Sequence, residues 1–362
     1  MTRTPQTGSD SGVDTLPGDS SDAADEVVPA APPAQGRRWI GAGLLAVVVA
    51  VIPLLTDNSF YLDVIIGILM LAAAGGAWNL LGGYAGQISL GHAAFFGVGG
   101  YTAVLLFTKA GLTPWLGVLV GGALAGLLGL GIGALTLRLR GPFFVLASIA
   151  FAQVLLILAI HLDWLTGGSP GVSVPFEPGT ANMVFDSRGS YVWLIGGFVV
   201  VVFAVTTWLD RHRLGFQAKA VRENVEAAEA LGINGTRVKL QMTVLSAALT
   251  GIIGGLSAFY IAFIDPDSSF GIARSIDFVL VAIIGGMGTI WGPLVGAVLV
   301  ELLHVELSGA LGGGGAGLYL VVYGVLMIVV VLFFPRGIVG GIETLRRKLR
   351  RSSEGRRRVR GS

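Results

Sequence analysis

GGYAGQISLGHAAFFGVGGYTAVLL, residues 82–106, is apolar enough to lie in a membrane, yet glycines and the polar side chains of Gln87, Ser89 and His92 interrupt it. A second stretch of this kind, GGMGTIWGP at residues 285–293, lies in the other half of the chain. Glycine and proline punctuate helices, because glycine is conformationally free and proline lacks an N–H donor. Paired broken helices in corresponding halves are typical of transporters, whose pathway lies at the interface between the repeats.

The composition of the whole chain indicates a membrane protein. Of its 362 residues, 53% are hydrophobic and 13% are charged, whereas about a quarter are charged in soluble domains. Apolar runs near the roughly 20 residues that cross a bilayer recur along the chain, and helices satisfy their own backbone hydrogen bonds in lipid. We therefore predict an all-α, polytopic membrane protein with broken or re-entrant helices. Cysteine is absent, which excludes disulfides and cysteine-ligated metals.

The positions of the apolar and basic segments predict about ten membrane segments, with both termini in the cytoplasm. Short loops rich in Lys and Arg stay cytoplasmic, which places Arg138, Arg140 and the block 211–239 on the side of the N-terminus. The arginine-rich C-terminus reaches that side only if one apolar segment is double, and we expect 276–303 to be a hairpin entered from outside, with its turn at 285–293. The apolar segments fall near 39–55, 60–82, 92–108, 115–137, 143–161, 191–209, 243–264, 276–303 and 316–334.

The two termini differ in composition from the membrane domain, which we assign to residues 39–340. Residues 1–38 are polar and acidic with little apolar content, so we predict a disordered cytoplasmic tail. Residues 341–362 contain LRRKLRRSSEGRRRVR, with nine of the chain's 24 Lys and Arg residues. A basic segment beside a span is typical of a cytoplasmic anchor to anionic lipid, with nucleic-acid binding as the alternative.

Polar side chains within the apolar segments are the candidates for a solute or ion pathway. Gln87, Ser89 and His92 either satisfy the backbone groups that a broken helix exposes or contact a solute, and the sequence leaves both roles open. Acidic residues in spans are candidates for ion coupling in a secondary transporter, and these are Asp63, Asp277 and Glu301. The chain has neither a G-x-x-x-x-G-K-[ST] phosphate loop nor an H-E-x-x-H motif, and its histidines are scattered. We expect no catalytic residue, cofactor or metal site in this chain.

The most charged internal stretch, VRENVEAAEALGINGTRVK at residues 221–239, predicts a short amphipathic helix in the cytoplasmic loop 210–242. Val221, Val225, Ala228 and Leu231 recur at helical spacing. Arg222 and Glu226 form an i,i+4 pair on another face, and Gly232 offers a C-terminal stop. The glutamates oppose adsorption to an anionic leaflet, so we expect the helix to dock on a protein at the cytoplasmic face.

Five ordered sequence blocks resemble the branched-chain amino acid permease family of ABC importers. Glu226-Ala227-Ala228 followed by Gly232 resembles the EAA loop by which such permeases engage their ATPases. The match is to the M-type (LivM-like) subunit, because T-G-G-S-P-G and R-E-N before the EAA block are M-type features. The blocks are GQISLGHAAFFGVGGYTA (86–103), GPFFVLASIAFAQ (141–153), TGGSPGVSVP (166–175), AVRENVEAAEALGINGTRVK (220–239) and IIGGMGTIWGPLVGA (283–297).

The resemblance implies a permease fold similar to type II importers and a role for three groups of residues. The coupling motif corresponds to Arg222, Glu226, Ala227, Ala228 and Gly232. A signature near the translocation path corresponds to Gln87, Ser89, Gly91 and His92. The outside loop that faces the binding protein corresponds to Thr166, Gly167, Gly168, Ser169, Pro170 and Gly171.

The same resemblance implies the partners and the solute. The importer would contain a homologous H-type permease, two ATPase subunits that bind ATP and Mg, and an extracytoplasmic solute-binding protein. Leucine, isoleucine and valine are the leading solutes, while other members of the family move urea, amides or aromatic acids. An ion-coupled secondary transporter and a passive channel are the rival interpretations.

Overall fold

The structure is a computed structural model that describes residues 36–136, 141–311 and parts of 321–341 (321–322, 324–325, 328, 332 and 337–341). Several sequence predictions concern residues outside these ranges. They are the acidic tail up to residue 35, the basic tail from residue 342, Arg138 with Arg140, and most of the apolar segment 316–334.

Long apolar helices make up most of the described chain, as predicted for an all-α membrane protein. Eight of them are long and apolar enough to cross a membrane, and the apolar part of α1, Ile40–Leu55, is shorter. Because the segment 316–334 lies mostly outside the described residues, the count of about ten membrane segments stays a prediction. The long helices are α1 (Gly36–Leu55), α2 (Ser59–Asn79), α3 (His92–Ala110), α4 (Pro114–Thr136), α5 (Pro142–His161), α7 (Arg188–Leu209), α10 (Gly235–Ile261), α12 (Ile272–Gly285) and α13 (Gly292–Leu311).

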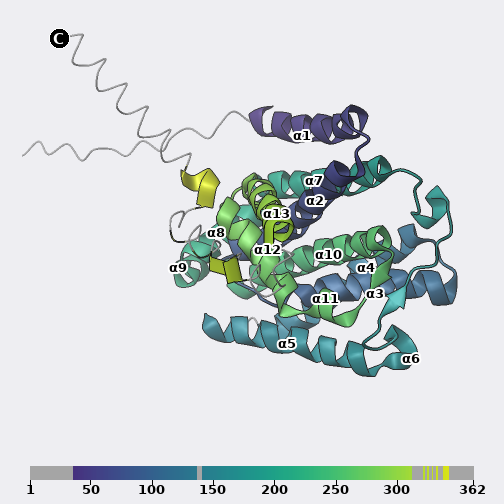
Figure 1. The fold of residues 1–362 in the computed structure, drawn as a ribbon. Helices are drawn as coiled ribbons and strands as arrows, with labels where there is room; N and C mark the ends of the chain where they lie inside the picture. Colours follow the sequence, from purple (N-terminus) through teal and green to yellow (C-terminus); the bar gives the residue numbers. More distant parts are fainter. Residues whose placement is uncertain are drawn as a thin grey trace, which may run out of the picture.

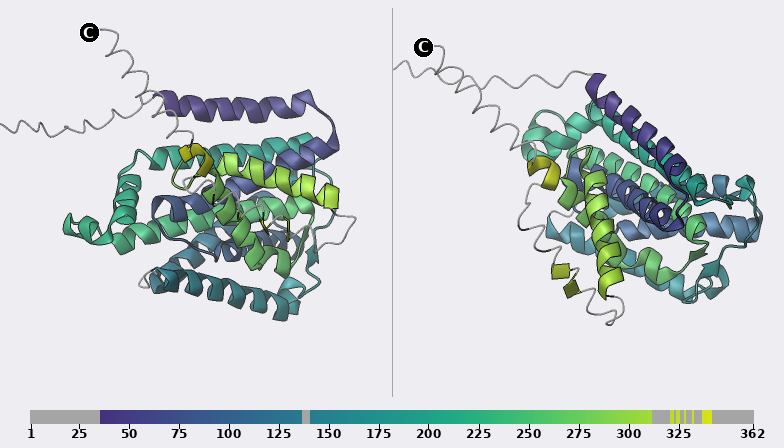
Figure 2. Two further views of the ribbon diagram at one scale, coloured as in Figure 1. Left: turned by 60° about the vertical axis from the view of Figure 1, so that its left-hand side comes forward. Right: turned by 45° about the horizontal axis from the view of Figure 1, so that its top comes forward.

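Shorter elements lie at the ends of this bundle. Helices α8 (Arg213–Glu223) and α9 (Val225–Ala230) project at one end, while α6 (Asp163–Thr166) lies at the other (Figures 1 and 2). A two-stranded antiparallel ribbon joins the loop after α6 to the end of α10, through β1 (Val172–Ser173) and β2 (Phe263–Ile264). The remaining elements are a π-helix at Leu80–Tyr84, a 3-10 turn at Thr180–Asn182 and α11 (Pro266–Phe270).

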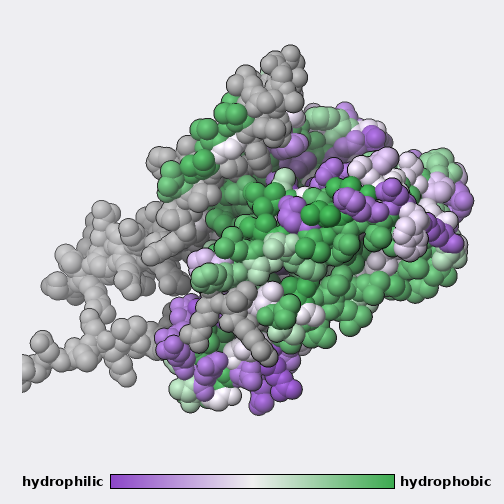
Figure 3. Space-filling model, turned by 90° about the horizontal axis from the view of Figure 1, so that it is seen from below, coloured by the Kyte–Doolittle hydropathy of each residue, from purple (hydrophilic) through white to green (hydrophobic). Residues whose placement is uncertain are grey.

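The surface of the bundle matches a lipid environment. Figure 3 shows a broad hydrophobic face over the body of the molecule, with hydrophilic residues mainly at its margins. Large apolar side chains are exposed along α4 and α5, including Leu119, Leu127, Phe143 and Leu146. In water such a continuous apolar surface would promote aggregation, whereas lipid accommodates it.

Glycines allow α3, α4 and α10 to pack with their backbones in close contact. A Cβ atom on Gly99 would lie 2.0 Å from the carbonyl oxygen of Gly251, and one on Gly121 would lie 2.5 Å from that of Gly99. Small residues at such crossings are the usual basis of helix association in membranes, where lipid offers no hydrophobic driving force between helices. Many of the chain's glycines therefore serve packing rather than flexibility.

The predicted hairpin is confirmed as a helix break between α12 and α13. The helical conformation stops at Gly285 and resumes at Gly292. The two arms approach so closely that a Cβ atom on Gly285 would lie 1.7 Å from the carbonyl oxygen of Gly292. Both arms extend beyond the apolar segment 276–303, and each belongs to a stretch long enough to cross a membrane.

Replacing Gly121 by Leu should prevent α4 from packing on α3, because the side chain would overlap backbone atoms rather than a movable side chain. We expect a loss of monodisperse, detergent-extracted protein in size-exclusion chromatography. Gly131→Leu, on the same helix but with nothing within 4 Å of its Cβ position, is the matched control and should give the parental yield. Equal yields for the two variants would contradict the packing role of Gly121.

Candidate functional site

The cytoplasmic segment that was predicted as one helix over 221–231 is two helices. Asn224 is extended, with φ −157° and ψ 113°, and separates α8 from α9. Its side-chain oxygen accepts a hydrogen bond from the backbone N–H of Ala227 at 3.0 Å. Asparagine favours this N-cap conformation over the helix interior. The prediction of a continuous helix is therefore wrong, and the signal that contradicts it is local.

Because of the break at Asn224, the residues of the predicted apolar face differ in burial. Val221 and Ala228, on the predicted apolar face, are buried within this chain, whereas Leu231 is 81% exposed. It lies past the end of α9, where Gly232 takes the left-handed conformation with φ +82°, as predicted for a C-terminal stop. Arg222 and Glu226 lie on different helices, so they do not form the predicted pair along one helix. Glu226 and Ala227 are on the exposed side of α9.

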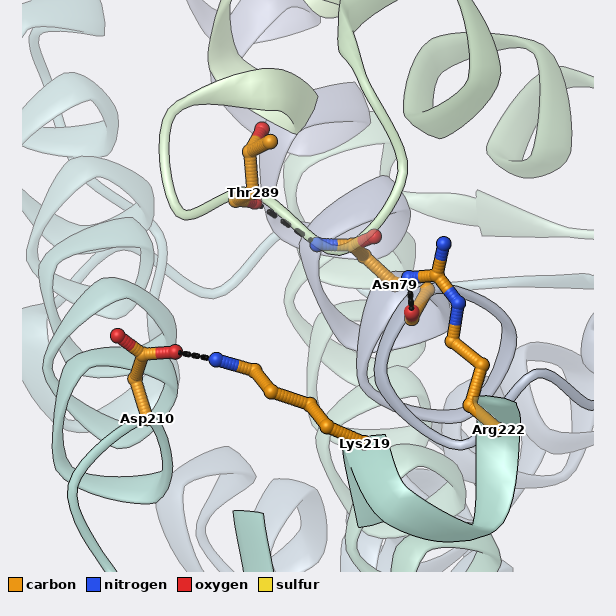
Figure 4. A network of polar contacts seen from close by, with 6 residues as sticks. Asn79, Asp210, Lys219, Arg222 and Thr289 are labelled. Atoms are coloured by element: carbon orange, nitrogen blue, oxygen red, sulfur yellow. Dashed lines mark hydrogen bonds and ion pairs between the residues drawn. The ribbon is translucent and has the colours of Figure 1, made fainter. Parts of the chain in front are cut away.

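Arg222 instead connects α8 to the first broken helix. Its Nη1 atom donates a hydrogen bond to the carbonyl oxygen of Gly83, in the π-helix that follows α2, at 2.5 Å (Figure 4). The preceding turn is tied to the second break, because the Asn79 amide donates to the carbonyl of Thr289 at 3.0 Å and accepts from the N–H of Gly288 at 2.8 Å. A Cβ atom on Gly288 would lie 2.5 Å from Arg222 Nη1.

These five residues, Asn79, Gly83, Arg222, Gly288 and Thr289, form what we call the broken-helix junction. Three parts of the chain meet there: the end of α2, helix α8 and the turn between α12 and α13. The two glycine-interrupted stretches of the sequence are thus in contact with each other. A displacement of α8 would act on both of them.

A second set of contacts seats α8 on the bundle. Lys219 pairs with Asp210, which caps the end of α7 (Figure 4). The Lys219 ammonium also lies 5.2 Å from the centre of the Tyr84 ring. Beneath them, Ala218 and Val221 pack in one apolar cluster with side chains of the π-helix. Sequence reasoning missed this set, because a helix end separates Lys219 from Asp210 and Tyr84 is far from both in the sequence.

Ser89 and His92 lie in the first break and hold its backbone in place. The carbonyl of Ser89 accepts from the indole N–H of Trp78 at 2.7 Å. His92 is fully buried, and its Nε2 lies 2.8 Å from Ser246 Oγ. The Ser246 hydroxyl donates its only proton to the carbonyl of Ala77 at 2.6 Å, so His92 Nε2 carries the proton in that contact.

Gly91 and Gln87 complete the predicted pathway group in different ways. A Cβ atom on Gly91 would lie 2.4 Å from the carbonyl oxygen of Ser148 on α5, so glycine permits the close approach of the two segments. Gln87 is half-buried and lines a cavity of about 510 Å³ beside Pro142 and Phe144 at the start of α5. Ser89, Gly91 and His92 thus stabilise the packing of the first break. Contact of Gln87 with a solute stays a prediction.

The predicted binding-protein loop, 166–171, is a compact turn at the end of the bundle opposite α8. Thr166 is buried and donates to the carbonyls of Ala159 and Leu162, at 2.6 and 2.9 Å. Gly167, Gly168 and Gly171 have positive φ angles, which explains the glycines of this block. Ser169 and Pro170 are exposed at its tip, where a partner can reach them.

The acidic residues proposed for ion coupling differ in their surroundings. Asp63 lies 3.0 Å from Arg188 Nε and accepts a hydrogen bond from the Tyr260 hydroxyl at 2.6 Å. A carboxylate that is already paired in this way is a poor candidate for binding and releasing an ion. Asp277 and Glu301 instead line one cavity.

Comparison with known proteins agrees with this architecture. The profile of the family described as "Branched-chain amino acid transport system / permease component" matches residues 58–331. The chain belongs to this family. It is 28% identical over 290 residues to the LivM permease proteins of Salmonella typhimurium and of Escherichia coli, a match that covers 72% of this chain and 65% of each relative. The chain thus spans somewhat less than two thirds of the length of these relatives.

The match extends to permeases of the other type. The probable LivH permease of Methanocaldococcus jannaschii is 28% identical over 258 residues, covering 67% of this chain and 80% of that protein. No solved structure gives a significant match. The LivM-like type predicted from the sequence fits these findings, and the chain is a multi-pass membrane protein of the permease family.

Replacing Asn79 by Ala should destabilise the junction, because it leaves the partly buried N–H of Gly288 and carbonyl of Thr289 without their partner. We expect a loss of about 1–3 kcal/mol in unfolding free energy, measured as a lower midpoint of thermal unfolding in detergent. Asn182→Ala is the control, since its amide makes only 3.4 Å contacts to Glu177 in a loop. An unchanged midpoint for Asn79→Ala would contradict the bridging role.

Proposed function

We propose that this chain is the M-type permease subunit of an ATP-driven ABC importer that carries branched-chain amino acids. The observation that carries the proposal is the broken-helix junction, where Arg222 bonds to the first interrupted helix and lies beside the turn of the second. Family membership supports the transport role. The names of the relatives support leucine, isoleucine and valine as the solutes.

The proposed assembly contains a homologous H-type permease, two ATPase subunits that bind ATP and Mg, and an extracytoplasmic solute-binding protein. Relatives of both the LivM and the LivH type support the second permease. This chain itself supplies no catalytic residue. In the proposed orientation, both termini and α8–α9 face the cytoplasm of a bacterial cell at its inner membrane, and the loop 166–171 faces the binding protein.

In this proposal the exposed side of α9 and the chain after it dock in a groove of the ATPase. Glu226, Glu229 and Leu231 lie on this surface, and Leu231 offers an apolar anchor of the kind that such docking requires. When the ATPase subunits close, α8 and α9 move as one cytoplasmic unit. Arg222 then pulls on Gly83 and presses against Gly288, so the motion reaches both broken helices without unfolding any span.

Arg222→Met keeps the length of the side chain but removes the donor to Gly83. We expect the ATPase subunits to remain attached and ATP-driven leucine uptake in proteoliposomes to fall by about tenfold, the change that corresponds to 1.4 kcal/mol. Arg213→Met, at the exposed start of the same helix, should retain uptake. If Arg222→Met transports at the parental rate, the junction is not the point of transmission.

Gly232→Val tests the orientation of α9 through the backbone alone, because a Cβ atom at this position meets nothing within 4 Å. The left-handed conformation resists most side chains by about 1–2 kcal/mol but tolerates asparagine better. We therefore expect Gly232→Val to hydrolyse ATP with reduced uptake and Gly232→Asn to stay close to the parent. The measurement is the ratio of leucine taken up to ATP hydrolysed. Identical ratios for both variants would disprove the requirement for a left-handed conformation at residue 232.

A further inference from the structure

A cavity of about 240 Å³ lies among α2, α3, α10, α12 and α13, away from the broken-helix junction. A cavity needs roughly 10–15 Å³ of such volume to hold one water molecule, so this one has room for several waters or a small solute. Charged side chains enter it from two helices, Arg274 and Asp277 from α12 and Glu301 from α13.

The two carboxylates of this cavity lack direct partners. Within the part of the chain that the structure describes, neither Asp277 nor Glu301 makes a hydrogen bond or an ion pair within 4 Å. Gly67 leaves the room that Glu301 occupies, since a Cβ atom there would lie 2.3 Å from Glu301 Oε1. Unpaired acids between membrane helices are unfavourable unless water or a cationic group compensates them. Arg274 interacts electrostatically with both acids, and His304 also lines this cavity. Two carboxylates against one guanidinium still leave a place for a second positive group.

Arg274 supplies the opposite charge at the same cavity. Its Nε donates to the carbonyl of Ser268 at 3.2 Å, and its guanidinium carbon lies 5.5 Å from the centre of the Phe96 ring. These contacts fix the side chain while the terminal nitrogens remain suited to bind a carboxylate in the bidentate manner that arginine favours. Positive and negative groups thus line one small space without contacting each other directly.

The rest of the cavity wall is largely apolar. Met70, Leu71, Phe96, Phe278 and Val300 contribute to it. A solute that carries both charges and an apolar group would find a partner for each of them in this wall. Pockets of this composition, apolar with a few converging polar groups, are the usual form of small-molecule sites.

The cavity lies toward the end of the bundle that receives the solute in the proposed orientation. Arg274 and Asp277 are in the first two turns of α12, whereas the end of α12 leads into the junction with α8. Ser257, which also lines the cavity, is in the last two turns of α10, just before the strand that pairs with the loop after α6. The site is thus separated from the cytoplasmic helices by most of the bundle.

We propose that this cavity binds the zwitterion of an α-amino acid with a small apolar side chain, with its carboxylate on Arg274 and its ammonium on Asp277 and Glu301. The inference rests on the proposed function, which it deepens by placing a solute site within the permease itself. A metal cation or an amine without a carboxylate would use only the acids, and a carboxylate without an ammonium would use only Arg274.

The absence of native cysteine allows a direct binding test. In the reconstituted complex without ATP, Ser257→Cys places one thiol on the cavity wall, and its rate of reaction with a small methanethiosulfonate reagent is measured. L-leucine at about ten times its dissociation constant should slow the reaction about tenfold, because the free fraction falls as 1/(1 + [L]/Kd). Isocaproate, isopentylamine and NaCl should protect much less. Met70→Cys provides a second thiol site if Ser257→Cys does not assemble.

Variants in the cysteine background separate recognition from structure. Arg274→Gln and Glu301→Gln should abolish protection by L-leucine, Arg274→Lys should restore part of it, and Glu306→Gln, on the exposed side of α13, should leave it unchanged. Protection by NaCl or isopentylamine equal to that by leucine would overturn the zwitterion site in favour of a cation site. Equal protection in Arg274→Gln and the parent would also overturn it.

A separate uptake assay distinguishes failure of the site from failure of the proposed function. If the parent complex takes up leucine with ATP but leucine gives no protection at either thiol, the site is wrong while the importer stands. If leucine protects as expected but uptake does not depend on ATP, the site stands and the importer is wrong.

Discussion

A break in a membrane helix exposes backbone N–H and C=O groups that lipid cannot hydrogen-bond, and the arrangement of this permease depends on how those groups are satisfied. The partners are polar side chains from distant parts of the chain. Asn79 serves the turn after α12, Arg222 serves the end of the π-helix, and Ser148 accepts from the N–H of Leu90. Each break is therefore stable only when other helices are already in place.

Because the breaks depend on distant partners, they are connected to the segments that supply those partners. Because the partner of Gly83 is a side chain of α8, the hydrogen bond that stabilises the first break also connects it to the cytoplasmic segment. The same guanidinium lies next to Gly288, in the turn of the second break. A continuous helix would need no such partner and would offer α8 no equivalent point of attachment. The hydrogen bond between Arg222 and Gly83 thus stabilises the first break and, in the proposed mechanism, also transmits the motion of α8 to it.

The sequence predicted those features whose signals are local. Apolar length, glycine breaks and the left-handed Gly232 follow from short windows of residues, and the structure confirms them. The break at Asn224 was missed because the apolar period of 221–231 outweighed the capping preference of one asparagine. Leu231 was placed on the same helical face as Val221 and Ala228 for the same reason.

The missed site residues have partners that are distant in sequence. Asn79 bonds to Thr289, and Arg274 shares a cavity with Glu301 of the next helix. The apolar periodicity of the sequence cannot predict which side chains meet, because this depends on how α2, α12 and α13 pack together. Asp63 illustrates the reverse case, because it looked like an isolated acid in a span until the fold brought Arg188 and Tyr260 to it.

Helix α12 connects the charged cavity to the broken-helix junction. It begins with Arg274 and Asp277 at the cavity and leads into Gly288 at the junction. With 14 residues, it is about 21 Å long by the rise of an α-helix, and packed helices move as rigid bodies rather than bending continuously. In the proposed mechanism, a shift of the turn at Gly288 reaches Asp277 through α12 and Glu301 through α13. The close packing of the two arms at Gly285 and Gly292 makes them move together at the turn.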